Sequence, residues 1–164
     1  GNCSISIREL IMTTETKQMF EIDVTFNLKI STETLLDVIC GIGQGSTYWC
    51  SDFAVGHLPV DEDNVVQLPN EQWSYEGCAA WNHDINENSP IVIKDHLEDE
   101  TYKFTVKDLV NTIQNICCNK SDTHESYCKT IREAFINEDM GMIDAIGSDI
   151  IAQNLAFKGR CEYG

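Results

Sequence analysis

The sequence predicts a mainly β fold, a two-sheet β-sandwich with two short helices and long disulfide-pinned loops. Three observations predict it. Residues 21–31, EIDVTFNLKIS, alternate apolar and polar side chains without a break, which is the period of a strand with one buried face. Helical periods appear in only two stretches, both between residues 105 and 137. Eight cysteines are spread along the chain, which is typical of a disulfide framework.

The size and composition predict one globular domain spanning residues 1–164. The chain is 42% hydrophobic and 23% charged, close to globular averages, and a domain near this length buries about 70% of its unfolded surface. No apolar run reaches the roughly 18 residues that a membrane helix needs. The opening residues GNCSISIREL lack the basic segment and cleavage site of a signal peptide. We therefore interpret the chain as a mature or excised domain.

The first third of the chain is predicted to be β. Residues 3–12 alternate in part, and residues 21–31 alternate strictly. At about 3.3 Å per residue, the second run would span roughly 36 Å. Residues 34–42, TLLDVICGI, are a mostly apolar run that predicts a buried strand ending at glycines.

The middle of the chain, residues 41–90, has the turn-rich composition of a long irregular connection. Short strands such as residues 64–68 are expected within it, because fifty residues without regular structure are unusual in a compact domain. Cys50 and Cys78 would pin this connection. It also contains clustered aromatic residues, which we expect to be core residues, with anchors at a binding rim as the alternative: Tyr48, Trp49, Trp73, Tyr75 and Trp81.

Residues 90–106 predict two strands around an acidic turn. The period then becomes helical over residues 105–116, where Thr105 and Asp108 resemble a capping box. A second helix is predicted over residues 124–137. The tail, residues 142–161, is predicted to return as one or two strands. Together these elements favour the sandwich.

The cysteines and two glycosylation sequons predict secretion. Asn2 and Asn119 begin the sequons Asn-Cys-Ser and Asn-Lys-Ser, and both features are typical of oxidising compartments. Four bridges allow 105 connectivities, among which the sequence does not choose. The adjacent pair is expected to take different partners because a bridge between neighbours is strained. The predicted disulfide cysteines are Cys3, Cys40, Cys50, Cys78, Cys117, Cys118, Cys128 and Cys161.

The net charge indicates the kind of partner. Eleven basic and 27 acidic residues give 11 − 27 = −16, which disfavours nucleic acid and anionic membranes and favours small basic proteins. Charge runs are most often solvated faces, but dense acidic turns together with an acidic strand face also fit a docking surface. The predicted partner-binding residues are Glu21 and Asp23 on the strand, and Asp61, Glu62, Asp63, Glu98, Asp99 and Glu100 in the turns.

No motif predicts a catalytic residue, a cofactor or a metal. Gly41, Gly43 and Gly45 follow an apolar run, but the next residues, STYWCSDF, do not favour the helix that a phosphate loop requires. Cys118, His124 and Cys128 lack the close Cys-x-x-Cys spacing usual in structural zinc sites. The four histidines lie in separate contexts, His57, His83, His96 and His124.

The chain from NCSISIRELIMTTETKQMFEIDVTFNLKIS through IQNICCNKSDTHESYC to FKGRCEYG resembles the C-terminal SECRET domain of poxvirus decoy tumour-necrosis-factor receptors of the cytokine response modifier type. Residues 22–24, Ile-Asp-Val, are also similar to an early strand of the viral CC-chemokine inhibitor. The resemblance implies a secreted viral β-sandwich that binds host chemokines and blocks leukocyte migration. It also implies tumour-necrosis-factor-binding repeats before this domain in the full-length protein. No such repeats are present in these residues, so this chain is not expected to bind that cytokine.

The expected function is therefore a non-enzymatic chemokine trap. Two alternatives stay open. A secreted hydrolase would use a pair of acidic residues, one of them buried in a cleft. A structural or oligomerisation module of a larger secreted protein would self-associate. The preferred chemokines and the sheet face that binds them are also open.

Overall fold

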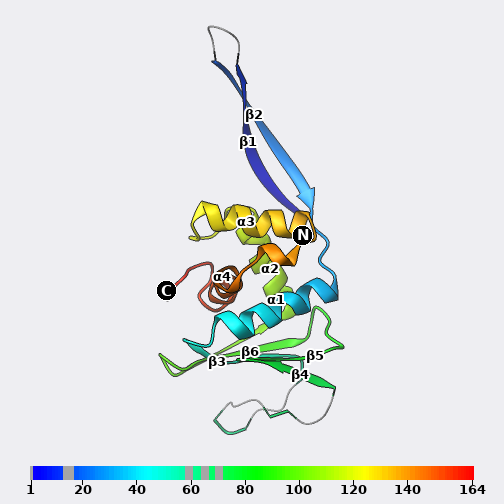
Figure 1. The fold of residues 1–164 in the computed structure, drawn as a ribbon, viewed down its shortest axis with the longest axis vertical. Coiled ribbons are helices and arrows are strands. Elements are labelled where there is room, and N and C mark those ends of the chain that lie inside the picture. Colours follow the sequence, from blue (N-terminus) through cyan, green and yellow to red (C-terminus); the bar gives the residue numbers. More distant parts are fainter. Residues whose placement is uncertain (1, 13–16, 58–60, 64–66, 69–71) are drawn as a thin grey trace.

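The protein has a mixed α/β fold, so the predicted two-sheet sandwich is wrong. One five-stranded sheet lies beneath a layer of helices, and a long two-stranded hairpin projects from the other end (Figure 1). The computed structural model describes residues 2–12, 17–57, 61–63, 67–68 and 72–164, and of residues 2–12, 17 and 22–27 it describes the backbone alone.

The sheet has the strand order β4-β5-β3-β6-β7. β3 runs parallel to β5, whereas the other neighbours are antiparallel. Its inner face includes Phe53, Ile91 and Ile93, which are fully buried. The predicted strand pair within residues 90–106 is confirmed. The strands are β3 (Cys50–Val55), β4 (Trp73–Glu76), β5 (Ala79–Asn82), β6 (Pro90–Asp95) and β7 (Glu100–Thr105).

Two helices occur where the sequence predicts them. α2 (Val106–Cys117) begins with the predicted capping box: the backbone amide of Asp108 donates to the hydroxyl oxygen of Thr105, and the amide of Thr105 donates to the Asp108 carboxylate. α3 (Glu125–Ile136) follows. A short 3-10 helix, η1 (Met140–Met142), then leads towards the last helix.

α4 (Ala145–Ala156) replaces the strands predicted within residues 142–161. Residues 147–157 are all buried, so protein surrounds this helix from Gly147 to its end. A helix of this kind lacks a polar face, and its apolar residues do not repeat at the helical period. That is why the prediction was wrong.

α1 (Thr32–Gly45) replaces the buried strand predicted over residues 34–42. Ser31 caps it by accepting a hydrogen bond from the amide of Thr34 at 3.1 Å. The glycines predicted to form a turn lie inside this helix, where they permit close packing. A Cβ at Gly43 would overlap the backbone carbonyl of Glu76, and a Cβ at Gly41 would overlap the Ser148 hydroxyl.

The hairpin consists of β1 (Asn2–Met12) and β2 (Lys17–Asn27). They pair antiparallel, with Ile7 opposite Ile22. Both were predicted as strands, although β2 ends four residues before the alternation does, 31 − 27 = 4. They form a separate two-stranded sheet and are not part of a sandwich.

The predicted framework of four disulfides is also wrong. Cys118 is disulfide-bonded, and the side chain of Cys3 lies outside the described residues. The remaining six cysteines are free thiols: Cys40, Cys50, Cys78, Cys117, Cys128 and Cys161. The thiols of Cys50 and Cys78 donate to the backbone carbonyls of Asp52 and Ile42.

Alkylation of the denatured protein without reductant is therefore expected to modify at least six cysteines. In the native protein, exposed Cys161 should react before Cys117, because burial raises the pKa of the Cys117 thiol to about 12 and thiolate is the reactive form. Intact and peptide mass spectrometry would measure both results. A denatured protein that takes up no label would restore the four-bridge framework.

Candidate functional site

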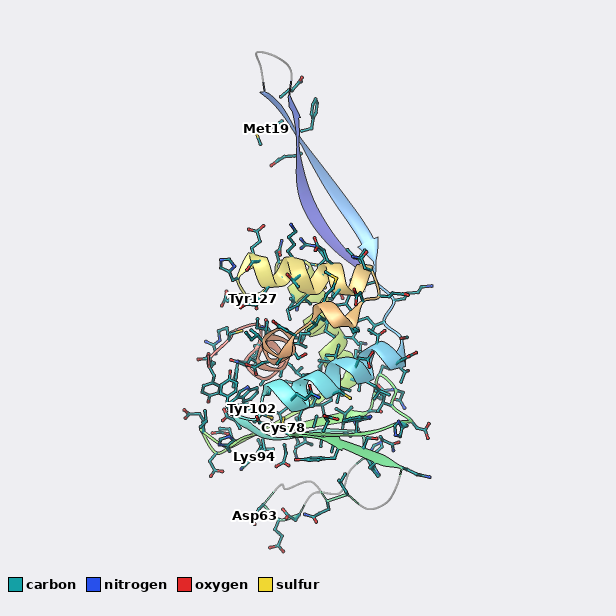
Figure 2. The ribbon with its side chains drawn as sticks, viewed as in Figure 1. Met19, Asp63, Cys78, Lys94, Tyr102 and Tyr127 are labelled. Atoms are coloured by element: carbon teal, nitrogen blue, oxygen red, sulfur yellow. The ribbon has the colours of Figure 1, made fainter. Side chains whose placement is uncertain are left out.

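A largely apolar cavity of about 560 Å³ lies between the end of α1, the start of α3, α4 and the C-terminal segment. Tyr127 extends from α3 on the side of the C-terminal segment (Figure 2). Ligand sites in proteins commonly measure roughly 300 to 1,000 Å³ and are lined mainly by apolar and aromatic residues. We name this cavity the tyrosine pocket, after three of its large lining side chains. The large apolar and aromatic residues that line it are Tyr48, Tyr127, Ile146, Ile150 and Tyr163.

A buried carboxylate supports one wall of the tyrosine pocket. Asp149, on α4, is only 7% exposed. Its Oδ1 accepts hydrogen bonds from the Ser46 hydroxyl at 2.8 Å and from the Trp49 indole nitrogen at 2.6 Å. Its Oδ2 accepts from the Tyr48 hydroxyl at 2.6 Å and from Gln153 Nε2 at 2.8 Å. Four donors therefore satisfy the carboxylate, which explains its burial without a partner cation.

Gln153 attaches the C-terminal segment to α4. Its Oε1 accepts hydrogen bonds from the backbone amides of Glu162 at 2.8 Å and Tyr163 at 2.9 Å. Its Nε2 also donates to the backbone carbonyl of Tyr163 at 3.1 Å. The Tyr163 hydroxyl donates in turn to buried Asp95, at the end of β6, at 2.8 Å. The segment therefore connects α4 to the sheet and completes the pocket wall.

The tyrosine hydroxyls act as fixed donors. Burial, followed by the hydrogen bond to Asp149, raises the pKa of Tyr48 above its ordinary value of 10. Burial and the hydrogen bond to Asp95 raise the pKa of Tyr163 in the same way. Both phenols therefore stay protonated at neutral pH. These hydrogen bonds fix the Tyr48 hydroxyl on Asp149 and the Tyr163 hydroxyl on Asp95.

The structure brings the two predicted acidic turns together near one lysine. Lys94, on β6, forms an ion pair with Asp99 at 2.8 Å. Its pKa is raised first by that hydrogen bond, and also by the charges of Asp63 and Asp52. The predicted turn residues are all exposed: Asp61, Glu62, Asp63, Glu98, Asp99 and Glu100.

The predicted acidic strand face lies elsewhere. Glu21 is exposed on β2, in the hairpin at the opposite end of the molecule from the sheet (Figure 1). The side chain of Asp23 lies outside the described residues. Glu21 therefore lies away from the acidic turns, and the acidic residues predicted from the sequence do not form one docking surface.

Other residues singled out from the sequence have local structural roles. His124 caps α3 by accepting from the amide of Ser126 at 3.2 Å, and buried Cys128 donates to the carbonyl of Thr123. Within the described ranges, no group of three or more His, Cys, Asp or Glu side chains could hold a metal ion. Asn119 is exposed after α2, whereas the side chain of Asn2 lies outside the described residues.

The aromatic cluster is divided between buried and exposed residues. Trp49 and Trp81 are buried core residues, as the sequence favoured. Tyr48 and Tyr75 are exposed, and Trp73 is half-buried. Of the five, Tyr48 lines the tyrosine pocket.

Sequence reasoning missed Asp149, Gln153 and Tyr163. The first two lie four residues apart in DIIAQ, which places them on one face of a helix. The tail was predicted as strands, so their common face went unrecognised.

Comparison of the chain with models of known families, with curated proteins and with solved structures found no match. Among the residues that the structure describes, no helix has the length and apolar character needed to cross a membrane.

Proposed function

We propose that the chain is a non-enzymatic binding protein that captures a small basic protein, and that an apolar side chain of this partner enters the tyrosine pocket. Chemokines are the class of partner that the sequence resemblance suggests. The observation that carries the proposal is an apolar, aromatic pocket in a molecule of net charge −16.

The surroundings of the pocket are acidic. Asp122 is exposed and lines its rim. Glu125, Asp144 and Glu162 are also exposed, and each directly follows or precedes a lining residue in the chain. Glu162 forms an ion pair with Arg160 at 3.3 Å. A cationic partner is therefore attracted to this end of the molecule, which speeds association more than it strengthens the complex.

An apolar anchor would supply the affinity. Burying one large aliphatic or aromatic side chain contributes about 1.5 to 3 kcal/mol, and such anchors dominate many interfaces. A standard interface covers about 800 Å² on each partner, so the pocket would be its centre and the acidic surroundings its rim.

The observations that support this proposed function differ from those that the sequence led us to expect. The sandwich implied by the SECRET resemblance is wrong, so the proposal does not rest on a shared fold. Secretion stays a prediction supported by the sequons at Asn2 and Asn119. For the hydrolase alternative, the buried carboxylate of the pocket is Asp149, and its four hydrogen-bond donors all come from protein side chains.

Surface plasmon resonance against a panel of basic chemokines would test the proposal. Replacing Ile146 with arginine places a cation in the pocket wall and should weaken binding about tenfold or more, because one lost anchor corresponds to at least 1.4 kcal/mol. Leu97→Arg is the matched control, because Leu97 is 52% exposed and Ile146 is 55% exposed. It adds the same charge in the acidic turn after β6.

Rising salt should slow association of the unmodified protein. Loss of binding in Leu97→Arg, with Ile146→Arg unaffected, would move the site to the acidic turns near Lys94. No binding to any basic protein of the panel would contradict the proposal. Sedimentation of the chain alone would then test the oligomerisation alternative.

A further inference from the structure

The hairpin of β1 and β2 is a sheet of only two strands that projects from the helices (Figure 1). A two-stranded sheet is marginally stable in water, whereas three or more strands with an apolar face are stable. At the base of the hairpin β1 contacts α2. Among the residues that the structure describes, no further strand pairs with the outer edge of β1 or of β2. The hairpin therefore offers backbone amides and carbonyls to an additional strand.

One face of the hairpin is apolar. In the register of the two strands, Ile5 lies opposite Val24 and Ile7 lies opposite Ile22, and residues two apart in a strand share a face. Phe20 belongs to the same face of β2 and is 41% exposed. A strand that pairs with the hairpin and continues this face would supply the size that a stable sheet needs.

The charges along β2 are only partly matched within the hairpin. Glu21 lies opposite Arg8, whereas the positions opposite Lys17 and Asp23 are uncharged. Lys17 comes three residues before Phe20 and Asp23 three residues after it, 20 − 17 = 23 − 20 = 3. Because an even number of residues separates them, both lie on the face opposite the apolar one. β2 therefore carries a cation and an anion at positions symmetric about Phe20.

We propose that two copies of the chain pair through β2, antiparallel and in a register centred on Phe20. This register places Lys17 of each copy opposite Asp23 of the other, and opposite charges at directly opposed positions stabilise a strand pair. It joins the two hairpins into one four-stranded sheet with its apolar positions on one face. The arrangement has two-fold symmetry, so it closes at two chains.

Other registers are less favourable. A shift by one residue opposes apolar positions to polar ones. Centres at residues 21, 22 and 23 oppose Glu21 to itself, Glu21 to Asp23 and Asp23 to itself, and like charges at opposed positions destabilise. A centre at residue 19 opposes Lys17 to Glu21, which already lies opposite Arg8. On β1, Arg8 and Glu9 occupy opposite faces, so self-pairing of β1 opposes no unlike charges.

The distribution of charge favours a second copy over a basic protein at this surface. The two strands carry two basic and three acidic residues, 2 − 3 = −1, of the net charge of −16. In the proposed register the ends of the two β2 strands are 2 × (27 − 20) = 14 residues apart along the sheet, about 46 Å. This separation far exceeds the Debye length of about 8 Å at physiological salt. Repulsion between the two acidic bodies is therefore screened.

Analytical ultracentrifugation of the full chain, from low to high micromolar concentration, would test the proposal. The mass should rise from 18.5 kDa towards twice that value and no further. A monomer at every concentration would overturn the proposal, and so would assemblies larger than a dimer. Neither β1 nor β2 lines the tyrosine pocket, so the dimer neither requires nor excludes capture of a basic protein, and each proposal can fail without the other.

Charge exchange would test the register. Lys17→Glu should weaken the dimer about tenfold or more, because symmetry turns two pairs of unlike charges into two pairs of like charges. Asp23→Lys should weaken it similarly. The double variant, Lys17→Glu with Asp23→Lys, restores both pairs with reversed signs and should recover the dimer. A double variant that is as weak as the single ones would contradict the proposed pairing.

Lys29→Glu is the matched control for Lys17→Glu. It makes the same change of charge at an exposed residue beyond the end of β2, and it should leave the dimer unchanged. Equal weakening by the two substitutions would show a nonspecific effect of charge and overturn the proposed interface.

Hydrogen exchange followed by mass spectrometry would identify the edge that pairs. Backbone amides within residues 17–23 should exchange more slowly as the concentration of the protein rises, because the second copy covers the edge of β2. Amides within residues 2–12 should change little. Protection that rises in residues 2–12 alone would place the interface on β1 and contradict the proposal.

Discussion

Replacing Asp149 with alanine is expected to lower the free energy of unfolding by about 2 to 5 kcal/mol. The substitution leaves the Ser46 hydroxyl and the Trp49 indole nitrogen, both on fully buried residues, without an acceptor. Each unsatisfied buried donor costs about 1 to 3 kcal/mol. Tyr48 and Gln153 lose partners as well. Urea titration followed by far-UV circular dichroism would measure the change without depending on the fluorescence of Trp49.

Asp122→Ala is the matched control for this substitution. Asp122 lines the same pocket but is exposed, so its removal changes the net charge equally and should alter stability by less than about 0.5 kcal/mol. Asp149→Asn should fall between the two. It retains an acceptor for Trp49, but its new amide nitrogen would face the amide nitrogen of Gln153, and both are donors. Equal midpoints for the two alanine variants would show that the buried network contributes little.

Replacing Gly43 with alanine is expected to destabilise the protein by about 1 to 3 kcal/mol, as overpacking of a core usually does. In an open helix this change would instead stabilise by about 1 kcal/mol. At Gly43 the added methyl group would meet the backbone carbonyl of Glu76 and lie 2.9 Å from the Cβ of Ala79. The amide of Cys78 also donates to the Gly43 carbonyl at 3.0 Å, so neither backbone can withdraw without breaking that bond. Thermal and urea unfolding would measure the loss.

Gly41→Ala provides the comparison on the same helix. There the nearest atom is the hydroxyl oxygen of Ser148, which belongs to a side chain that can rotate. Gly41→Ala should therefore cost less than Gly43→Ala, while both gain the same helix propensity. A larger loss at Gly41 than at Gly43 would contradict the importance of the contact between α1 and the β4–β5 turn.

The sequence predicted the elements whose signals are local. The capping box of Thr105 and Asp108 fixes the start of α2 through bonds between residues three apart, and it is present as predicted. The α3 helix shows a clear period, with Ile131 and Phe135 buried and Glu125 and Lys129 exposed. The β6–β7 pair encloses a short acidic turn. In each case the residues that determine the structure lie within a short stretch of the sequence.

The wrong predictions share a different cause. α1 was taken for a strand because its apolar residues are nearly continuous and its glycines suggested a turn, whereas those glycines are required by neighbours 33 and 107 residues away, 76 − 43 and 148 − 41. α4 has no solvent-exposed polar face because protein surrounds it from Gly147 to its end. The cysteine pattern suggested bridges, but the side-chain placement leaves six thiols free. In all three cases, α1, α4 and the cysteines, contacts between residues distant in the sequence determine the structure. Local sequence patterns do not show such contacts.

The candidate site was the least predictable part. Acidic turns are visible in the sequence, and the structure does bring two of them near Lys94. The tyrosine pocket instead combines residues from α1 to the C-terminal segment, and the hydrogen bond that joins Tyr48 to Asp149 spans 101 residues. The site could be recognised only once the position of α4 in the fold was known.

The attachment of the C-terminal segment to Gln153 makes that pocket wall a separable part of the molecule. Residues 160–164 belong to no strand or helix. They are held by hydrogen bonds to the side chains of Gln153 and Asp95 and by packing of the Tyr163 ring against Trp49 and Phe157. Segments held by a few such bonds detach at a much smaller free energy than whole-domain unfolding requires. Tyr163 and Gly164 both line the tyrosine pocket. Detachment of the C-terminal segment would therefore widen the pocket entrance while the helices and the sheet remain folded.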